Sequence, residues 1–229
     1  ATTRACSRAQ NGAGVGVLPW SSLTWNEADA ACRAAGMRLC RATRKGVTVV
    51  TDEWGTACLG GQSCSASGVY PYACSYSASA CNGLDANLGH AAACGSYPGC
   101  MTVGDLDTAS SSDKVFDLSG NLAEWTDDRR DATDTTVAQP GAGSDSAIYT
   151  TRGGAYDSFF PGMACDFMGT QVHPTFSFPD TGFRCCSSCQ PGQADCGGVC
   201  KNLGTDSANC GSCGVTCATG KLCTNGVCS

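Results

Sequence analysis

The chain has 229 residues, of which 20 are cysteine and 30 are glycine, and its formal net charge at pH 7 is −6. No apolar run approaches the roughly 20 residues that a membrane-spanning helix needs. Only four lysines occur in this acidic chain, so it has no basic face for the phosphates of nucleic acid. The composition predicts a soluble, disulfide-rich protein with no nucleic-acid partner and no membrane span.

The cysteines indicate an oxidising compartment, because their even number allows ten disulfides, which persist only there. Zinc is the alternative, since Cys186 and Cys189, like Cys210 and Cys213, have ligand-like spacing. Histidine co-ligands are missing, and these pairs lie among many irregularly spaced cysteines. The chain opens on Ala-Thr-Thr, so we expect that a signal peptide has been removed from a secreted, extracellular protein. The cysteines assigned to disulfides are Cys6, Cys32, Cys40, Cys58, Cys64, Cys74, Cys81, Cys94, Cys100, Cys165, Cys185, Cys186, Cys189, Cys196, Cys200, Cys210, Cys213, Cys217, Cys223 and Cys228.

The first expected element is a helix that begins at a capping box. Thr24 and Glu27 have the spacing at which each side chain accepts a hydrogen bond from the other residue's amide. The alanine-rich run 28–35 favours helix, and Gly36 provides the stop.

Further along, the β-branched run 47–50 predicts a short strand. A second helix is expected to begin near Thr51, with Trp54 facing inward. Residues 59–113 are rich in Gly, Ser and Cys with little periodicity, which predicts loops held by disulfides. The polar stretch 133–146 is expected to be an exposed loop. These features indicate an α+β fold rich in loops.

Three segments of the second half stand out together, namely residues 117–125 (DLSGNLAEW), 152–156 (RGGAY) and 182–185 (GFRC). In order and spacing they resemble the formylglycine-generating-enzyme (sulfatase-modifying factor) family, whose hallmarks are a GN-x-x-EW segment, an RGG turn and a terminal GFR. The resemblance covers roughly residues 15–187 and implies a loop-rich fold of the C-type-lectin kind. Upstream, residues 34–40 (AAGMRLC) and 70–82, with YPY and CN, are similar to two further family segments.

The family's catalytic chemistry is not expected here. The resemblance implies two cysteines after the RGG turn that bind copper as thiolates, the soft ligands that Cu(I) prefers. In register these positions are Ser158 and Met163, and neither is a thiol. Cys165 is nearby but is expected to be bridged. We therefore expect no copper and assign no catalytic residue.

Other metal and nucleophile chemistries also lack support. His90 and His173 lie in unlike contexts, without the spacing of a two-histidine, one-carboxylate iron site. A Gly-x-Ser-x-Gly nucleophile elbow is missing from the sequence.

Calcium is the metal that the sequence favours. Calcium prefers hard oxygen ligands, and Asp117 and Glu124 supply carboxylates on either side of a Ser-Gly-Asn turn. The resemblance implies the ligand set Asp117, Gly120, Leu122 and Glu124. The alternative is that these carboxylates only cap turns, beside a buried Trp125.

Two arginines also match the family pattern. Arg152 and Arg184 are expected to make fixed hydrogen bonds to carboxylates or carbonyls and so to hold loops in place. A role in binding a ligand is the alternative for either of them.

The cysteines fall into two groups, twelve up to Cys186 and eight from Cys189 onward. Pro-Gly punctuation in residues 187–193 marks a boundary, so we predict a formylglycine-generating-enzyme-like domain over 1–187 and a cysteine-rich disulfide module over 188–229. The second module has no aromatic residue, and cross-links must hold it. Its sequence resembles cysteine-rich repeats of the stigma-specific-protein type.

The leading functional hypothesis is a secreted, non-catalytic binding or structural protein. Its loops would serve cell-surface recognition or an extracellular assembly such as an adhesin layer or filament. The expected partner is an extracellular protein, a glycan or a second copy of the chain. The alternatives are a divergent metal-dependent oxidoreductase of the same family and a calcium-dependent glycan binder.

Overall fold

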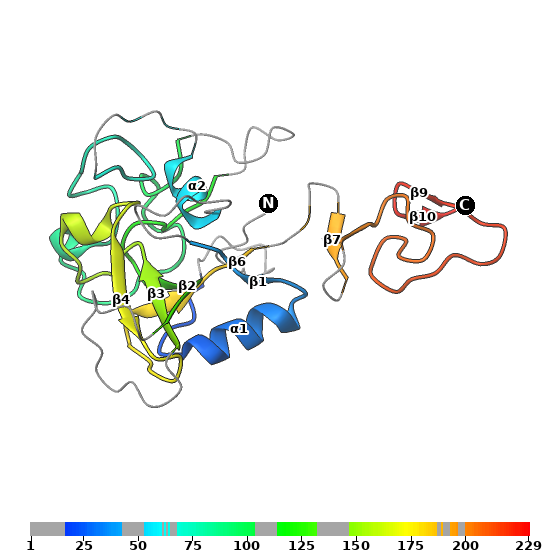
Figure 1. Cartoon of the computed structure of the whole chain (residues 1–229). Coiled ribbons are helices and arrows are strands. Elements are labelled where there is room, and N and C mark those ends of the chain that lie inside the picture. The colour runs from blue at the N-terminus through cyan, green and yellow to red at the C-terminus, as the bar shows by residue number, and fades with distance from the viewer. Residues whose placement is uncertain are drawn as a thin grey trace.

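The structure is a computed structural model that describes residues 17–42, 53–60, 62, 64, 68–103, 114–131, 147–186, 189, 193–196 and 200–229. Its helices are α1 (Trp25–Ala34), α2 (Glu53–Leu59) and the 3-10 helices η1 (Leu84–Ala86) and η2 (Phe160–Met163), and Figure 1 shows their arrangement. The strands are β1 (Arg38–Leu39), β2 (Ala123–Asp131), β3 (Ala147–Arg152), β4 (Met168–Val172), β5 (Thr181–Phe183), β6 (Cys185–Cys186), β7 (Gln193–Asp195), β8 (Cys200–Asn202), β9 (Cys223–Thr224) and β10 (Val227–Cys228).

Helix α1 confirms the predicted capping box. The Thr24 Oγ1 accepts a hydrogen bond from the Glu27 amide at 3.2 Å, and the Glu27 Oε2 accepts one from the Thr24 amide at 2.8 Å. The helix ends at Ala34, and Gly36 follows with φ 68°, in the left-handed region that favours glycine. Local sequence therefore fixes both ends of this helix.

The central sheet has four strands in the order β4-β3-β2-β5. Strand β2 runs antiparallel to β3 and parallel to β5. The short β5 is therefore an edge strand, paired with β2, which lies far from it in the sequence. Helix α1 packs on this sheet through Trp25, whose ring stacks on Tyr149 of β3 with centroids 3.7 Å apart. The indole of Trp125 lies in the same core and donates to the Leu23 carbonyl at 3.0 Å.

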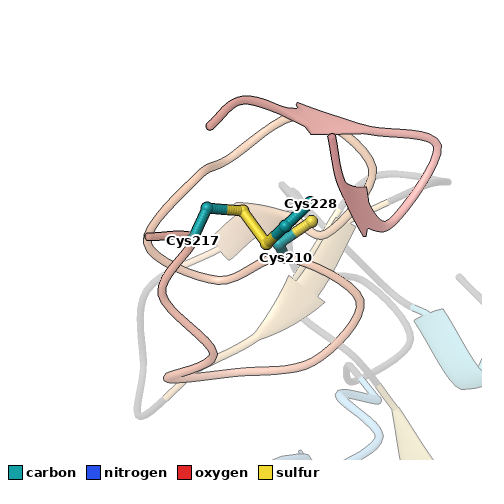
Figure 2. Close-up of side chains that lie close together, drawn as sticks. All are labelled: Cys210, Cys217 and Cys228. Carbon is teal, nitrogen blue, oxygen red and sulfur yellow. A yellow bond between two sulfur atoms is a disulfide. The ribbon is translucent and has the colours of Figure 1, made fainter. Parts of the chain in front are cut away.

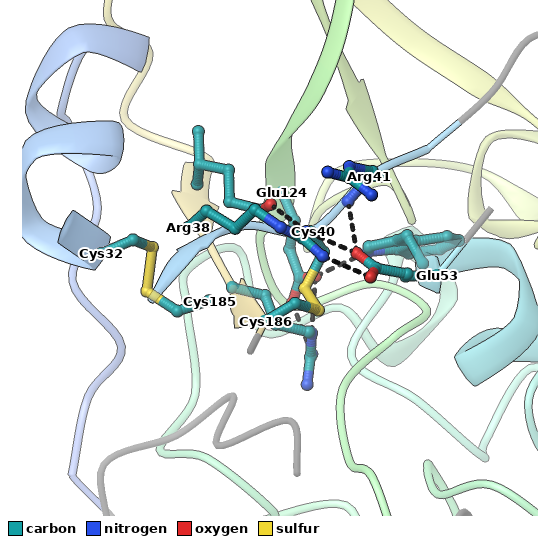
Figure 3. The surroundings of a disulfide bond; sticks show 11 residues. Cys32, Arg38, Cys40, Arg41, Glu53, Glu124, Cys185 and Cys186 are labelled. Carbon is teal, nitrogen blue, oxygen red and sulfur yellow. Dashed lines mark hydrogen bonds and ion pairs between the residues drawn. A yellow bond between two sulfur atoms is a disulfide. The ribbon is translucent and has the colours of Figure 1, made fainter. Parts of the chain in front are cut away.

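Two adjacent cysteines fasten α1 and β1 to the end of the sheet. Cys185 bonds to Cys32 of α1, and Cys186 bonds to Cys40 just after β1, as Figure 3 shows. Strands β1 and β6 also pair in antiparallel register. The start of α2 joins the same corner, where Arg38 forms an ion pair with Glu53.

The middle of the domain is loop, as its composition predicts. Between residues 68 and 103 the structure contains only the short η1 and isolated bridges. The disulfide Cys81–Cys100 closes this region, and Cys58–Cys165 ties α2 to the segment after η2. Trp54 of α2 is 1% exposed, which confirms that it faces inward. The predictions for residues 47–50, Thr51 and 133–146 fall outside the described residues.

Cross-links account for most of the order in the C-terminal segment. Four disulfides join Cys189 to Cys200, Cys196 to Cys213, Cys210 to Cys223 and Cys217 to Cys228. None of the described disulfides crosses residues 187–188, so each module is cross-linked within itself. Cys94 is disulfide-bonded as well. Within the described ranges, no helix combines the length and apolar character needed to cross a membrane.

The ion pair of Glu53 gives a pH-dependent prediction. Burial raises the pKa of this carboxyl, but hydrogen bonds from Arg38 and the Arg41 amide, with the nearby positive charge, more than offset it and lower the pKa overall. A lowered pKa in the folded state contributes stability above the unfolded value, which is lost as pH falls through the folded value. Glu53→Gln should therefore lower the free energy of unfolding by about 1 kcal/mol at pH 7 and by little at pH 3.

Urea unfolding with disulfides intact, measured at both pH values, checks this difference. Asp29→Asn is the control, because Asp29 pairs with an Arg33 side chain that is 70% exposed, and its effect should stay below about 0.5 kcal/mol. An equal loss for Glu53→Gln at pH 3 and pH 7 contradicts the assignment.

Candidate functional site

The three motif segments lie side by side on adjacent strands. In the sheet, Glu124 of β2 is the register partner of Arg152 of β3 on one side and of Gly182 of β5 on the other. The GN-x-x-EW, RGG and GFR segments therefore converge at one end of the sheet. The motifs are far apart in the sequence, and the pairing of β2 with β3 and with β5 brings them together.

Glu124 is the centre of this convergence. Its Oε1 accepts a hydrogen bond from Arg184 Nη2 at 2.5 Å, and its Oε2 accepts from Arg184 Nε and from the indole of Trp54, each at 2.8 Å. Glu124 and Arg184 are 6% and 2% exposed. A buried carboxylate needs such compensation, because an unpaired charge in the interior is very costly.

Arg152, the second arginine, contacts Trp54 of α2 and the segment after η2. The Arg152 guanidinium lies 5.2 Å from the centre of the Trp54 ring and donates through Nη2 to the Cys165 carbonyl at 2.7 Å. Arg184 Nη2 also donates to the Phe116 carbonyl at 3.1 Å. The prediction that both arginines make fixed hydrogen bonds to carboxylates or carbonyls is confirmed.

The Gly-Asn turn is fixed by its contact with another motif. Gly120 has φ +70°, and a Cβ there would lie 2.4 Å from the Asn82 carbonyl oxygen, so only glycine fits. The backbone amide of Asn121 donates a hydrogen bond to that carbonyl at 2.7 Å. The Asn121 Oδ1 accepts hydrogen bonds from the Asn82 side chain and from the Ala92 backbone amide. The CN and GN motifs are thus two halves of one hydrogen-bonded clamp on the loop between residues 82 and 92.

Three of the four predicted calcium ligands line a single cavity. Asp117, Leu122 and Glu124 surround a space of about 20 Å³ together with Arg184, and Gly120 lies on the turn that joins them. This volume has room for one water or ion. Asp117 has φ 59°, a left-handed conformation that Asp and Asn tolerate better than most residues.

The charges around this cavity do not cancel among the residues that line it. Two carboxylates face one guanidinium, and both oxygens of Glu124 are already hydrogen-bonded to Arg184. Burial raises the pKa of the Asp117 carboxyl to about 6; the Gly95 amide and Arg184 oppose the shift and Glu124 adds to it. Oxygen ligands with an excess of negative charge fit a hard cation such as calcium.

Of the two positions that correspond to the family's catalytic cysteines, Met163 lies in the packed interior and Ser158 is partly exposed. Met163 is 1% exposed, and its sulfur lies so close to Gly83 that a Cβ there would be 2.2 Å away. The Ser158 Oγ accepts a hydrogen bond from the Ala155 amide at 2.9 Å, which closes a local turn. Cys165 is bonded to Cys58 as expected, and none of the described cysteines carries a free thiol.

The two histidines do not form a site with each other. His90 Nδ1 lies 3.0 Å from the neighbouring Ala91 carbonyl, and His173 Nδ1 lies 2.8 Å from Thr175 Oγ1. Among the described residues, the single group of three possible metal ligands is Cys210, Cys217 and Cys228, whose sulfurs lie within 4.8 Å of one another. Figure 2 shows the Cys217–Cys228 disulfide beside Cys210. Cys210 is itself bonded to Cys223, so these sulfurs do not offer thiolates to a metal.

Family models match both parts of the chain. A model described as the sulfatase-modifying factor enzyme 1-like domain matches residues 2–189. The chain belongs to this family. A second model, the stigma-specific STIG1-like protein family, matches residues 177–229.

Two solved structures are similar to this sulfatase-modifying factor domain protein. Treponema denticola variable protein 1 is 15% identical, with 79% of this chain and 76% of that chain covered and a TM-score of 0.46. CarF is 17% identical, with 80% of this chain and 72% of that chain covered and a TM-score of 0.41. No match was found among curated proteins.

Sequence reasoning missed how the family motifs depend on each other. The Glu124–Arg184 pair joins residues 60 positions apart, and Asn82 meets Asn121 across 39 positions, so no local pattern reports either contact. The matching family motifs were the available signal. Their polar residues contact one another in this sulfatase-modifying factor domain.

The buried ion pair predicts a large and non-additive effect on stability. Arg184→Met leaves Glu124 as an uncompensated buried charge, so the free energy of unfolding should fall by about 3–5 kcal/mol. Adding Glu124→Gln to this variant removes that charge while leaving an acceptor for Trp54, and should restore part of the loss. Urea unfolding of the single and double variants measures the coupling.

Arg33→Met serves as the control, because the exposed Arg33–Asp29 pair should contribute less than about 0.5 kcal/mol. Strictly additive losses at Arg184 and Glu124 contradict a coupled pair.

Proposed function

We propose that this protein is secreted and that its sulfatase-modifying factor domain serves recognition or extracellular assembly without catalysing the family's oxidation reaction. The observation that carries the proposal is Met163, which fills the interior at a position where the family's chemistry requires a thiol. A thioether cannot form the thiolate that Cu(I) and oxygen activation need.

Two further observations support a non-catalytic role. Ser158, at the other catalytic position, uses its hydroxyl to close a turn, and the nearby Cys165 is consumed by a disulfide with Cys58. The polar residues that the family shares bond to one another in the interior, as Glu124 and Arg184 do. What remains for function is the outer surface of the loops, where binding residues are commonly placed.

Secretion is supported by the disulfides. Nine bridges are described, and four of them lie in the short C-terminal segment, where an apolar core is nearly lacking. Such a segment would lose its fold in a reducing cytosol, because cross-links replace the missing core. An oxidising, extracellular location suits both modules.

We also propose that calcium stabilises the domain at Asp117, Gly120, Leu122 and Glu124. Support comes from the shared cavity and from the two carboxylates, those of Asp117 and Glu124, that line it. Asp117 and Glu124 are 7% and 6% exposed, so the cation would be enclosed by protein. This favours a structural ion over one that offers an open position to a sugar.

The non-catalytic proposal predicts a chain without reactive thiols. Intact mass spectrometry after alkylation in denaturant, without reductant, should show the fully oxidised mass and no added label. Incubation with Cu(I) should leave no stoichiometric copper, and a cysteine-containing peptide should not be oxidised. Two labelled cysteines, or one bound copper per chain, would overturn the proposal and favour an oxidoreductase.

The calcium proposal predicts a metal-dependent stability. Calcium at 100 times its dissociation constant should raise the free energy of unfolding by about 2.7 kcal/mol over the chelated protein. Asp117→Gly removes the carboxylate while keeping the left-handed backbone of this position, and should abolish the increase. Thermal unfolding in calcium and in EDTA measures both, with magnesium as the matched ion of smaller radius. Equal unfolding of the unaltered protein in calcium and in EDTA contradicts the proposal.

A further inference from the structure

A row of aromatic rings extends from the core to the surface at the segment that carries Ser158 and Met163. Its rings form a chain of contacts, with centroids 5.4 Å apart for Tyr70 and Tyr76, 5.6 Å for Tyr76 and Phe160, and 6.3 Å for Phe160 and Phe159. The first ring is core and the last two are surface, since Tyr70 is 3% exposed while Phe160 and Phe159 are 52% and 61% exposed.

The two exposed phenylalanines are held in place by the rest of the domain. The Tyr70 hydroxyl donates to the Phe160 carbonyl at 2.8 Å, and Pro161 follows within the first turn of η2. The Leu84 amide donates to the Ser158 carbonyl at 2.9 Å and so joins the two loops that form the surface. Two large apolar rings are thus displayed on a rigid base, an arrangement typical of binding surfaces.

Carboxylates border these rings. The Asp85 Oδ2 accepts a hydrogen bond from the Tyr76 hydroxyl at 2.7 Å, and Asp157 is exposed two residues before Phe159. The chain has no lysine or arginine from residue 46 to residue 113 or from residue 153 to residue 183, the two stretches that build this surface. We name Tyr76, Phe159, Phe160, Asp85 and Asp157 the aromatic-acidic patch.

We propose that the aromatic-acidic patch binds a protein segment that carries exposed arginine or lysine side chains. The faces of phenylalanine rings attract cations, and arginine in particular stacks on them. The carboxylates of Asp85 and Asp157 would pair with the same cationic groups at the edge of the rings. This inference rests on the proposed recognition role and specifies the charge of the partner.

The negative charge of the patch favours a cationic segment over a neutral glycan or a second copy of this chain. A neutral glycan could stack on the rings and donate hydroxyl hydrogen bonds to the two carboxylates, but it would gain no charge attraction from this surface, whose two stretches carry no lysine or arginine. A second copy of this chain has a net charge of −6, which opposes self-association at an acidic surface. A cationic segment uses both features of the patch at once.

The test uses the full-length oxidised protein and a fluorescein-labelled peptide with six arginines alternating with glycine. Its twin replaces every arginine with citrulline, which has nearly the same shape and no charge. We expect saturable binding of the arginine peptide by fluorescence anisotropy, weakened at high salt, and at least about tenfold weaker binding of the citrulline peptide.

Substitutions locate the binding. The double variant F159A/F160A should weaken binding about tenfold, and D85N/D157N should weaken it and reduce its salt dependence. Phe176→Ala is the matched control, because Phe176 is 39% exposed on the connection between β4 and β5, and it should bind like the unaltered protein. Near-UV circular dichroism confirms that each variant keeps its fold.

Each other outcome overturns the inference. Equal binding of both peptides, or equal binding by F159A/F160A, removes the patch from cation recognition. An oligosaccharide library member that binds at the two phenylalanines while the arginine peptide does not would make the partner a glycan. Loss of self-association in F159A/F160A, measured by sedimentation, would make it a second copy. In all three cases the thiol and copper measurements still decide separately whether the domain is non-catalytic.

Discussion

The buried ion pair between Glu124 and Arg184 is the constraint on which the rest of the domain depends. It joins β2 to the residue that follows β5, and the Trp54 indole brings α2 to the same carboxylate. Because the interior makes an unpaired charge so costly, neither partner can move without the other, and the parallel β2–β5 pairing keeps its register. The loops are held against this end of the sheet by two contacts. Arg152 packs on the Trp54 ring, and Asn82 is hydrogen-bonded to Asn121.

Disulfides provide what the short elements cannot. Strands of two or three residues such as β1 and β6 add few hydrogen bonds, yet Cys185 and Cys186 anchor α1 and β1 across more than 140 residues of sequence. In the loop-confinement model, such long closures remove much of the entropy of the unfolded chain. The fold can therefore keep a long, glycine-rich loop region and still display a rigid surface.

Local signals in the sequence predicted only part of this arrangement. The capping box at Thr24 and Glu27 involves neighbours in the chain, so its geometry could be derived before the structure was known. The loop region predicted from residue 59 onward, where the structure describes it, and the hydrogen-bonding role of the two arginines were also confirmed. Their partners were not predictable, because Arg184 finds Glu124 only after β5 has paired with β2. Burial of Tyr70 likewise depends on contacts with η2, which lies 90 residues further along the chain.

Met163 stands at the position of the family's second catalytic cysteine and belongs to the same 3-10 helix as Phe160. Met163 lies between Gly83 and Gly120, so η2 packs tightly against the loop region. A reactive thiol pair needs access and a site that can open, whereas a binding surface needs rigidity. With this interior filled, Phe159 and Phe160 sit on a fixed base, and ordering them costs a partner little conformational entropy. The proposed absence of copper chemistry and the proposed recognition role therefore both draw on the packing of Met163 in η2.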